Sequence, residues 1–405
     1  MIKKIFQTIL IMPRYSDHYI HYTIVLLGLF GVVMQISAGM FTSSTFSYAT
    51  LITLTIRQVV YFIAGYIAMV IVANLFTFKR FVKLMMILMV IVIVLLLLTR
   101  LSTATGGAYG WIRFSLFGFG FSIQPSEFAK LMMILVMAVY LGDRKNVKLS
   151  TLILPPFIFF MVIMTLIGFY QKDMGTAILL TLITFFCFMI PTAKDLRLSQ
   201  LIALILAVIF FGLMIFFTTD KGIAILESLN ISAYQLTRFR AVQNPFYDKF
   251  GKGYFDLNNS LIGFSRGSLF GVGLGKSILK YSYISAATTD FIMEVVVEEL
   301  GFVGFMFVFG GYVILAWRLF KHSLLAKNER VKIVMIGVMM YFALHFIFNV
   351  GGVTCLIPLT GIPLLLISAG GSSTMASMMA IGVAQALINK EKVEALRKQY
   401  ENNSR

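Results

Sequence analysis

The stretch Tyr254–Gly301 reads YFDLNNSLIGFSRGSLFGVGLGKSILKYSYISAATTDFIMEVVVEELG and closes the one long polar segment of the sequence. It begins as glycine-rich sequence, carries the cations Arg266, Lys276 and Lys280, and ends with Asp290 at the edge of an apolar run. Glycines give a backbone the freedom to approach a ligand closely. A carboxylate beside a glycine loop and several cations indicates a site of chemistry, which the rest of the chain would hold at a membrane surface.

The composition is that of an integral membrane protein. Of the 405 residues, 59% are hydrophobic and 13% are charged, whereas soluble domains have roughly 25% charged residues. The net charge of +17 is explained by cytoplasmic loops that face anionic lipid, so we expect no nucleic-acid partner. Cys187 and Cys355 lie in or beside apolar runs without metal-like spacing, and we interpret both as core residues.

Apolar runs suited to membrane-spanning helices recur along the chain. A span needs roughly 20 apolar residues, so the predicted fold is an all-α integral membrane protein of about ten transmembrane helices. We expect a single polytopic membrane domain over 1–390, with a large extracytoplasmic loop at about 219–290 between helices 7 and 8, and a cytoplasmic tail at 391–405. The runs lie at about 22–40, 58–77, 84–99, 128–141, 152–169, 175–191, 200–218, 291–317, 333–350 and 362–388.

Lysines and arginines predict the orientation, because short cytoplasmic loops carry an excess of both. An even number of spans puts both termini on one side. The short loops of the other side hold only Arg57, Arg100, Arg113 and Lys172. We therefore predict that the N- and C-termini are cytoplasmic. The cations on the side of the termini are Lys3, Lys4, Arg14, Lys79, Arg80, Lys83, Arg144, Lys145, Lys148, Lys194, Arg197, Arg318, Lys321, Lys327, Arg330, Lys332, Lys390, Lys392, Arg397, Lys398 and Arg405.

A second outer feature is GGAYGWIRFSLFGFGFSIQPSEFAKL, from Gly106 to Leu131. Trp111 would suit an interfacial anchor, and the sequence Gln-Pro-Ser-Glu that ends at Glu127 is typical of a helix start. Lys130 follows on the same helix face as Glu127. The pair could be purely structural, but an ionisable pair entering a membrane is a functional hypothesis by default.

Other polar residues have both a structural and a functional interpretation. Asp173 would cap the helix that follows it, and it gains a functional role only if it faces the same cavity as Asp290. Arg238 and Arg240 of the large loop indicate little by themselves, because surface arginines are common. His345 is interpreted as a core histidine. Three carboxylates that enter the eighth span are unlikely to face lipid, so they line a cavity or meet cations; they are Glu294, Glu298 and Glu299.

Four motifs, in this order on about ten spans, resemble those of the SEDS family (shape, elongation, division and sporulation), which includes FtsW, RodA and SpoVE. They are GWI followed by QPSEFAKL; QKDMGT; SLFGVGLGKS, TTDFI and EELGFVG; and IPLTGIPL with SAGGSS. The sequence GLGKS with a later KYSYI is closer to the FtsW/SpoVE branch than to RodA. The resemblance implies a bacterial membrane glycosyltransferase that polymerises peptidoglycan from lipid II. It also implies that a class B penicillin-binding transpeptidase and other divisome or elongasome proteins are partners.

The family's essential outer carboxylate falls on Asp290, which the resemblance implies is the catalytic base. Where the family has an arginine before the tryptophan, this chain has Gly110. No metal-ligand cluster stands out, although a divalent cation (Mg or Mn) could help to hold the phosphates. The candidate substrate-binding residues, including the cations suited to a pyrophosphate, are Trp111, Glu127, Lys130, Asp173, Arg238, Arg240, Lys276 and Ser368.

The chemistry would need few groups. One carboxylate takes the proton of the attacking sugar hydroxyl, and cations hold the departing lipid pyrophosphate. The polyprenyl tail would lie in a groove between spans. Two other functions fit the sequence: a transporter of lipid-linked precursor, since broken helices and membrane-edge charges suit transporters, and a catalytically weak division scaffold. We favour the polymerase because the ionisable cluster lies at the outer edge.

Partner binding is expected on the eighth and ninth helices. Glycines permit close approach between membrane helices. The glycines that would meet the single span of a transpeptidase are Gly301, Gly304, Gly310 and Gly311.

Overall fold

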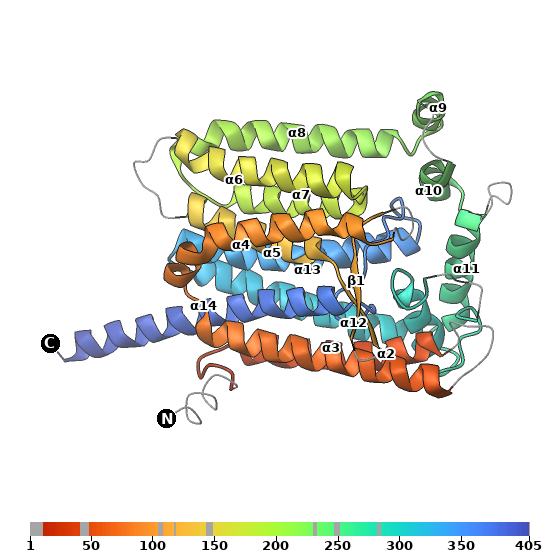
Figure 1. The fold of residues 1–405 in the computed structure, drawn as a ribbon, viewed down its shortest axis with the longest axis horizontal. Helices are drawn as coiled ribbons and strands as arrows, with labels where there is room; N and C mark the ends of the chain where they lie inside the picture. The colour runs from red at the N-terminus through yellow and green to blue at the C-terminus, as the bar shows by residue number, and fades with distance from the viewer. Residues whose placement is uncertain are drawn as a thin grey trace.

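The computed structural model describes residues 11–40, 48–103, 108–116, 119–142, 149–229, 233–246, 252–281, 284 and 286–404 (Figure 1). Six of the cations counted for the orientation lie outside these residues, namely Lys3, Lys4, Arg144, Lys145, Lys148 and Arg405. The membrane helices are α2 (His18–Gly39), α3 (Tyr48–Leu75), α4 (Phe78–Leu98), α5 (Pro125–Leu141), α6 (Leu149–Met164), α7 (Met174–Met189), α8 (Arg197–Phe216), α12 (Ile292–Leu325), α13 (Glu329–Val353) and α14 (Gly371–Asn403).

These helices confirm the predicted all-α membrane fold, since one of them lies at every predicted apolar run. Within the described part of the chain, 8 helices are long and apolar enough to cross a membrane, whereas α5 and α7 have 17 and 16 residues. The predicted large loop holds three shorter helices, α9 (Asp220–Ser228), α10 (Ala233–Gln243) and α11 (Lys252–Gly267). The strands β1 (Ile112–Leu116) and β2 (Phe119–Ile123) form an antiparallel hairpin before α5.

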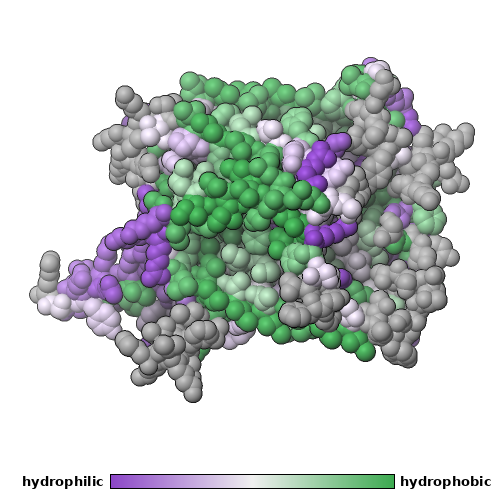
Figure 2. Space-filling view, viewed as in Figure 1, coloured by the Kyte–Doolittle hydropathy of each residue, from purple (hydrophilic) through white to green (hydrophobic). Residues whose placement is uncertain are grey.

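The bundle has two ends that differ in what they carry (Figure 1). Residues 11–17 and the C-terminal part of α14 lie at one end, called here the terminal end, and α9, α10 and α11 lie at the other, called the loop end. The last buried residue of α14 is Ile388, so the predicted tail is a helical extension that projects from the bundle. Figure 2 shows apolar side chains across the middle of the visible face, with polar residues toward both ends.

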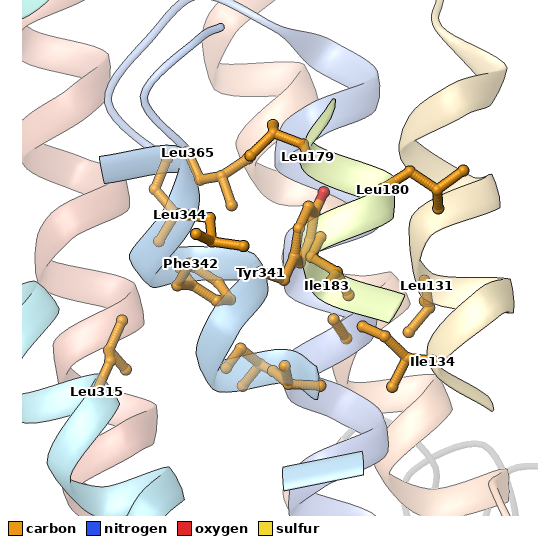
Figure 3. Packing of buried hydrophobic residues seen from close by; sticks show 14 of the residues in the cluster. Leu131, Ile134, Leu179, Leu180, Ile183, Leu315, Tyr341, Phe342, Leu344 and Leu365 are labelled. Carbon is orange, nitrogen blue, oxygen red and sulfur yellow. The ribbon is translucent and has the colours of Figure 1, made fainter. Parts of the chain in front are cut away.

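The core lies among α5, α7, α12 and α13. Figure 3 shows Leu131 of α5, Ile183 of α7 and Phe342 of α13 packed at the centre of the bundle. Helix α8 is different, because none of its residues is buried. A helix that is apolar on all faces yet unburied by protein is suited to lipid on its outer side. Helix α8 is therefore held to the bundle by little packing.

The predicted eighth span is α12, which is broken at Gly301 (φ 69°, ψ −163°). Residues 268–273, which follow α11, reach this break and supply the hydrogen bonds that the helix loses there. An unpaired backbone group at membrane depth would be costly, and this exchange of partners makes the interruption tolerable. The hydrogen bonds run from Val272 N to Glu298 O (2.9 Å), Gly273 N to Glu299 O (2.9 Å), Phe302 N to Ser268 O (2.9 Å) and Val303 N to Leu269 O (3.2 Å).

A buried ionic cluster joins three helices at the terminal end. Asp17 caps α2 and accepts hydrogen bonds from Arg318 (2.9 Å from Nε) and His322 (2.7 Å) of α12. Gln385 of α14 binds both the N–H and the carbonyl of Asp17, at 2.7 and 2.8 Å. Burial alone would raise the pKa of the Asp17 carboxyl, but the hydrogen bonds from His322 and Arg318 hold it well below its usual range. This cluster fixes how α2, α12 and α14 meet.

Candidate functional site

Asp290 lies in the turn before α12, at the loop end, and its side chain is half-buried. The three successive carbonyls of residues 288–290 all accept hydrogen bonds from later parts of the chain. The start of α12 is thereby fixed to α13 and to the segment 354–370 that connects α13 with α14. The bonds run from Ala369 N to Thr288 O (2.8 Å), Ser368 Oγ to Thr289 O (2.6 Å) and Asn349 Nδ2 to Asp290 O (2.8 Å).

The segment 354–370 forms one wall of the site. Gly361 has a φ of 70°, and a Cβ atom at this position would lie 3.3 Å from Asp290 Oδ2. A glycine accommodates this left-handed backbone without strain. Gln35 of α2 donates from its side chain to Ile367 O and Ser368 O, at 2.8 and 3.0 Å. Irregular backbone inside a membrane bundle is tolerated where neighbouring side chains pair its polar groups, as happens here.

The charge on Asp290 depends on groups from distant parts of the chain. Burial raises the pKa of its carboxyl above the ordinary value, a hydrogen bond from Thr289 and the charge of Arg238 on α10 lower it, and Asp173 raises it further. Asp173 caps α7, with its carboxylate accepting from Thr176 N (3.0 Å) and Thr176 Oγ1 (2.8 Å). The charge of Asp173 therefore acts on Asp290, and a functional role of Asp173 stays a prediction.

The segment before the hairpin approaches Asp173. Tyr109 N donates to Gln171 O at 2.8 Å. A Cβ atom at Gly110 would lie 3.6 Å from Asp173 Oδ2, and Gln124 Nε2 lies 3.5 Å from the same oxygen. Trp111 is half-exposed and directly follows Gly110, the residue whose Cβ position lies against Asp173.

Glu127 and Lys130 lie in the core, with exposed fractions of 1% and 0%. Lys130 Nζ contacts Glu127 Oε1 and His345 Nε2, both at 2.8 Å, and Tyr341 OH donates to Glu127 Oε2 at 2.7 Å. The other ring nitrogen of His345 faces Pro363 O at 2.9 Å, so it carries the proton and Nε2 accepts from Lys130. The network joins α5, α13 and segment 354–370. Lys130 is therefore enclosed by protein groups, with Glu127 and His345 as its partners.

The carboxylates of α12 are buried beside its break. Glu298 accepts from Ser277 Oγ and lies 3.4 Å from Arg266 Nε. Glu299 accepts from Lys280 at 2.7 Å. These two carboxylates meet cations, as we expected. The third, Glu294, is fully buried, and neither of its oxygens has a hydrogen-bond partner among the described residues.

The remaining candidates Lys276, Arg240 and Ser368 have different surroundings. Lys276 is exposed on the loop that follows α11. Arg240 forms an ion pair with Glu227 of α9. Ser368 is 1% exposed, and its hydroxyl donates to Thr289 O and accepts from Leu364 N. Ser368 thus shapes the main chain around Asp290, and of the loop arginines it is Arg238 whose charge reaches that carboxylate.

An apolar cavity of about 610 Å³ lies between α5, α6, α7 and α8. Met133, Met164, Phe185 and Phe210 are among its lining residues, and Met174, which directly follows Asp173, also contributes. We call this cavity the apolar groove. Through Met174, the lining of the groove reaches the residue next to Asp173. Methionines adapt their shape easily, which suits a long flexible ligand.

Two residues of the site were not singled out from the sequence. Asn349 binds the main chain of Asp290, and Gln124 lies against Asp173. An asparagine inside an apolar run is a signal in itself, because polar side chains inside a membrane are expensive and need partners. The sequence does not say which partners those are, since they lie 59 and 13 residues away in the chain.

These features define a class of protein: a polytopic all-α membrane protein with a carboxylate site at one end and an apolar groove between α5, α6, α7 and α8. The chain belongs to the FtsW/RodA/SpoVE family, whose model, described as "Cell cycle protein", matches residues 17–393.

Two relatives come from Bacillus subtilis (strain 168). Stage V sporulation protein E is 32% identical over 332 residues, which cover 81% of this chain and 84% of that protein. The probable peptidoglycan glycosyltransferase FtsW is 31% identical over 379 residues, which cover 92% of this chain and 90% of that protein. They agree with the predicted FtsW/SpoVE branch.

Two solved structures share the fold. One is a chain from work on the structural coordination of polymerization and crosslinking by a peptidoglycan synthase complex, with a TM-score of 0.69, 21% identity, and coverage of 93% of this chain and 98% of that chain. The other is the rod shape determining protein RodA of Thermus thermophilus, with a TM-score of 0.60, 21% identity, and coverage of 92% and 96%.

Proposed function

We propose that this protein is a peptidoglycan glycosyltransferase that polymerises lipid II, with Asp290 as the catalytic base. The observation that carries the proposal is the Asp290 carboxylate at the loop end, where the charge of Arg238 acts on it; the apolar groove, whose lining includes Met174 next to Asp173, supports it. The name of the FtsW relative, a probable peptidoglycan glycosyltransferase, supports the same reaction.

The reaction is a single displacement. The 4-hydroxyl oxygen of one disaccharide forms a bond to the anomeric carbon of another, and the bond from that carbon to the lipid pyrophosphate breaks. The electron pair of the broken bond leaves with the pyrophosphate, and the hydroxyl proton goes to Asp290. A base works best when its pKa approaches the working pH, and the raised pKa of Asp290 is in that direction. Attack from the face opposite the leaving group inverts the anomeric centre.

Charge and apolar surface have separate tasks in this proposal. Arg238 stabilises the negative charge that develops on the pyrophosphate, and the apolar groove takes the polyprenyl tail. Because α8 buries none of its residues, this wall of the groove can shift with little loss of packing. The tail would enter sideways from the bilayer, which explains why a sugar polymerase is a membrane protein.

We place the protein in the bacterial cytoplasmic membrane with its terminal end in the cytoplasm. We further propose a class B penicillin-binding transpeptidase as the partner, in line with the peptidoglycan synthase complex that shares the fold. Of the glycines expected at that contact, Gly301 and Gly311 are used within the chain, against Leu269 and Leu27. Gly310 has no other atom within 4 Å of its Cβ position among the described residues, so the α12 surface around it is the proposed contact.

The test is polymerisation of labelled lipid II by purified protein with its transpeptidase partner. Asp290→Asn retains the shape of the side chain but cannot take up the proton, so glycan product should fall by at least a hundredfold. Asp220→Asn is the matched control, because Asp220 is an exposed carboxylate of the same loop end. Near-normal polymerisation by folded Asp290→Asn protein would show that the base is elsewhere.

Transport of a lipid-linked precursor is the second candidate. The break of α12 at Gly301 favours it, because transporters use discontinuous helices at their binding sites. Vesicles that contain the protein and labelled lipid II separate the two functions. A transporter moves the label across the bilayer. It makes no polymer, either as wild type or as Asp290→Asn.

A further inference from the structure

The carbonyl oxygens of Asp290 and Ile362 both face one side-chain amide, that of Asn349 on α13. Asn349 Nδ2 donates to Asp290 O at 2.8 Å and to Ile362 O at 2.9 Å, and the side chain is 2% exposed. A primary amide has two N–H donors, so one nitrogen holds together two segments that lie far apart in the sequence. We propose that Asn349 is a positioning residue for glycosyl transfer, acting through the main chain of Asp290; this inference rests on the proposed function.

The wall of the site explains why this bridge matters. Ile362 follows Gly361, whose Cβ position lies 3.3 Å from Asp290 Oδ2. Asn349 therefore sets the separation between the base and the backbone against which its carboxyl rests. A catalytic group must be held to within about half an ångström to be productive, and a displacement of about 1 Å can cost on the order of a hundredfold in rate.

Helix α13 provides a rigid support for the bridge. His345 lies one helical turn before Asn349 and contacts Pro363 O at 2.9 Å. The side chains of Asn349 and His345 thus bind the neighbouring carbonyls of Ile362 and Pro363 from one helix face. His345 is itself locked by Lys130, but of the two residues Asn349 is the one that extends to Asp290. Both residues bind the segment 354–370. Asn349 alone of the two also binds the main chain of Asp290.

The other two bonds to this turn would keep it folded without Asn349. Ala369 N and Ser368 Oγ still hold the carbonyls of Thr288 and Thr289. Loss of the amide would unpair the carbonyls of Asp290 and Ile362 and let these two segments move apart, while the bond from Phe291 N to Ala286 O (3.2 Å) keeps the turn folded. We therefore expect a defect in the chemical step, with substrate binding through Arg238 and the apolar groove retained.

The decisive variant is Asn349→Leu, which has nearly the same shape and no N–H donor. We expect kcat for lipid II polymerisation to fall at least tenfold while KM stays within threefold of wild type. The matched control is Gln385→Leu, since Gln385 is a fully buried amide with two main-chain hydrogen bonds at the terminal end. That control should lower Tm at least as much as Asn349→Leu and leave kcat within twofold.

The outcomes are distinguishable from a failure of the proposed function. If Asn349→Leu retains kcat within twofold while Asp290→Asn is inactive, the positioning role is wrong and the function stands. If both amide variants lose kcat in parallel with Tm, Asn349 is merely structural and the proposal falls. If Asp290→Asn polymerises lipid II at a near-normal rate, the base is elsewhere and the positioning role of Asn349 falls with it. If wild-type protein makes no polymer, the function itself fails. Should Asn349→Leu not fold, Asn349→Ser, which keeps one donor, is judged by the same kcat and KM limits.

Discussion

At the scale of single residues, the behaviour of Asp290 depends on neighbours that come from separate parts of the chain. Burial and Asp173 raise the pKa of its carboxyl, while Thr289 and Arg238 lower it. The net rise means that a proton is held more tightly in the folded protein than by an ordinary aspartate. In its proposed role as the base, Asp290 would gain base strength at the cost of stability, a compromise that functional sites commonly make.

Replacement of Asp173 should move the acid side of the pH–rate profile. The base must be ionised, so polymerisation falls as the pH falls through the raised pKa of Asp290. Asp173→Asn keeps a good capping residue for α7 but removes a negative charge that raises this pKa. We therefore expect the acid limb to shift to lower pH, measured as the rate of glycan synthesis against pH. Asp220→Asn should leave the limb in place, and a shift to higher pH in Asp173→Asn would contradict the assignment.

Replacement of Asp290 should not weaken the fold at neutral pH. A carboxyl whose pKa is higher in the folded than in the unfolded protein (ordinary value 3.8) destabilises the fold once the pH rises through the folded pKa. Asp290→Asn removes that ionised group, so its Tm at pH 7.5 should equal or exceed that of wild type. Thermal unfolding in detergent measures this. A Tm clearly below wild type would mean that the Asp290 charge stabilises the structure.

At the scale of elements, the break in α12 is built by glycines. Gly301 adopts a positive φ and lies against the main chain of Leu269 and Gly271. Residues 268–273 take the place of the missing helical turn and carry the loop toward the three buried carboxylates of α12. The glycine-rich sequence therefore serves a close backbone approach between two segments of the chain, and no phosphate is needed to explain it.

A methyl group tests this interpretation at two positions of one helix. Gly301→Ala would place its Cβ onto Leu269 O in an unfavourable backbone conformation, so we expect a loss of about 2–4 kcal/mol in the free energy of unfolding. Gly310→Ala adds a Cβ where no atom lies within 4 Å in the described structure and should be neutral or stabilising by up to about 1 kcal/mol. Denaturant unfolding of both variants gives the comparison. Equal stabilities would show that the break tolerates a side chain.

At the scale of the whole molecule, the two ends of the bundle have different chemistry. The loop end holds the carboxylate site, and the terminal end holds the Asp17 cluster, where α2, α12 and α14 are joined by Arg318, His322 and Gln385. This arrangement puts residues 11–17 beside α14. We predict from the positive-inside rule that the terminal end lies in the cytoplasm.

Cysteine labelling tests the orientation. Lys276 is exposed at the loop end and Lys392 is exposed beyond the last buried residue of α14, so Lys276→Cys should react with an impermeant maleimide from outside and Lys392→Cys only after permeabilisation. Background labelling should be low, because Cys187 and Cys355 are buried. Burial also raises the pKa of the Cys355 thiol to about 11, and a protonated thiol reacts slowly. Labelling of Lys392→Cys from outside would show that the predicted topology is inverted.

The sequence by itself determined the class of fold and indicated where along the chain the candidate site lies. Long apolar runs can only be spanning helices, because lipid offers no hydrogen bonds to an open backbone, and the helices lie where those runs are. The position of Asp290 at the start of the eighth helix follows from the same pattern. These local signals can be read from the sequence because each helix forms its backbone hydrogen bonds within itself.

Only the tertiary structure decided which polar groups meet. Lys130 is enclosed by Glu127 and His345, Lys280 is paired with Glu299, and the charges that act on Asp290 come from Asp173 and Arg238. In the sequence, Lys276 and Lys280 lie in the same stretch as Asp290, which by itself made both of them candidate neighbours. A buried charge takes the partner that packing brings within a few ångströms, and helix packing joins segments without regard to their separation in sequence. Asn349 is the clearest case, because its two hydrogen bonds exist only once α13, α12 and the segment 354–370 have packed together.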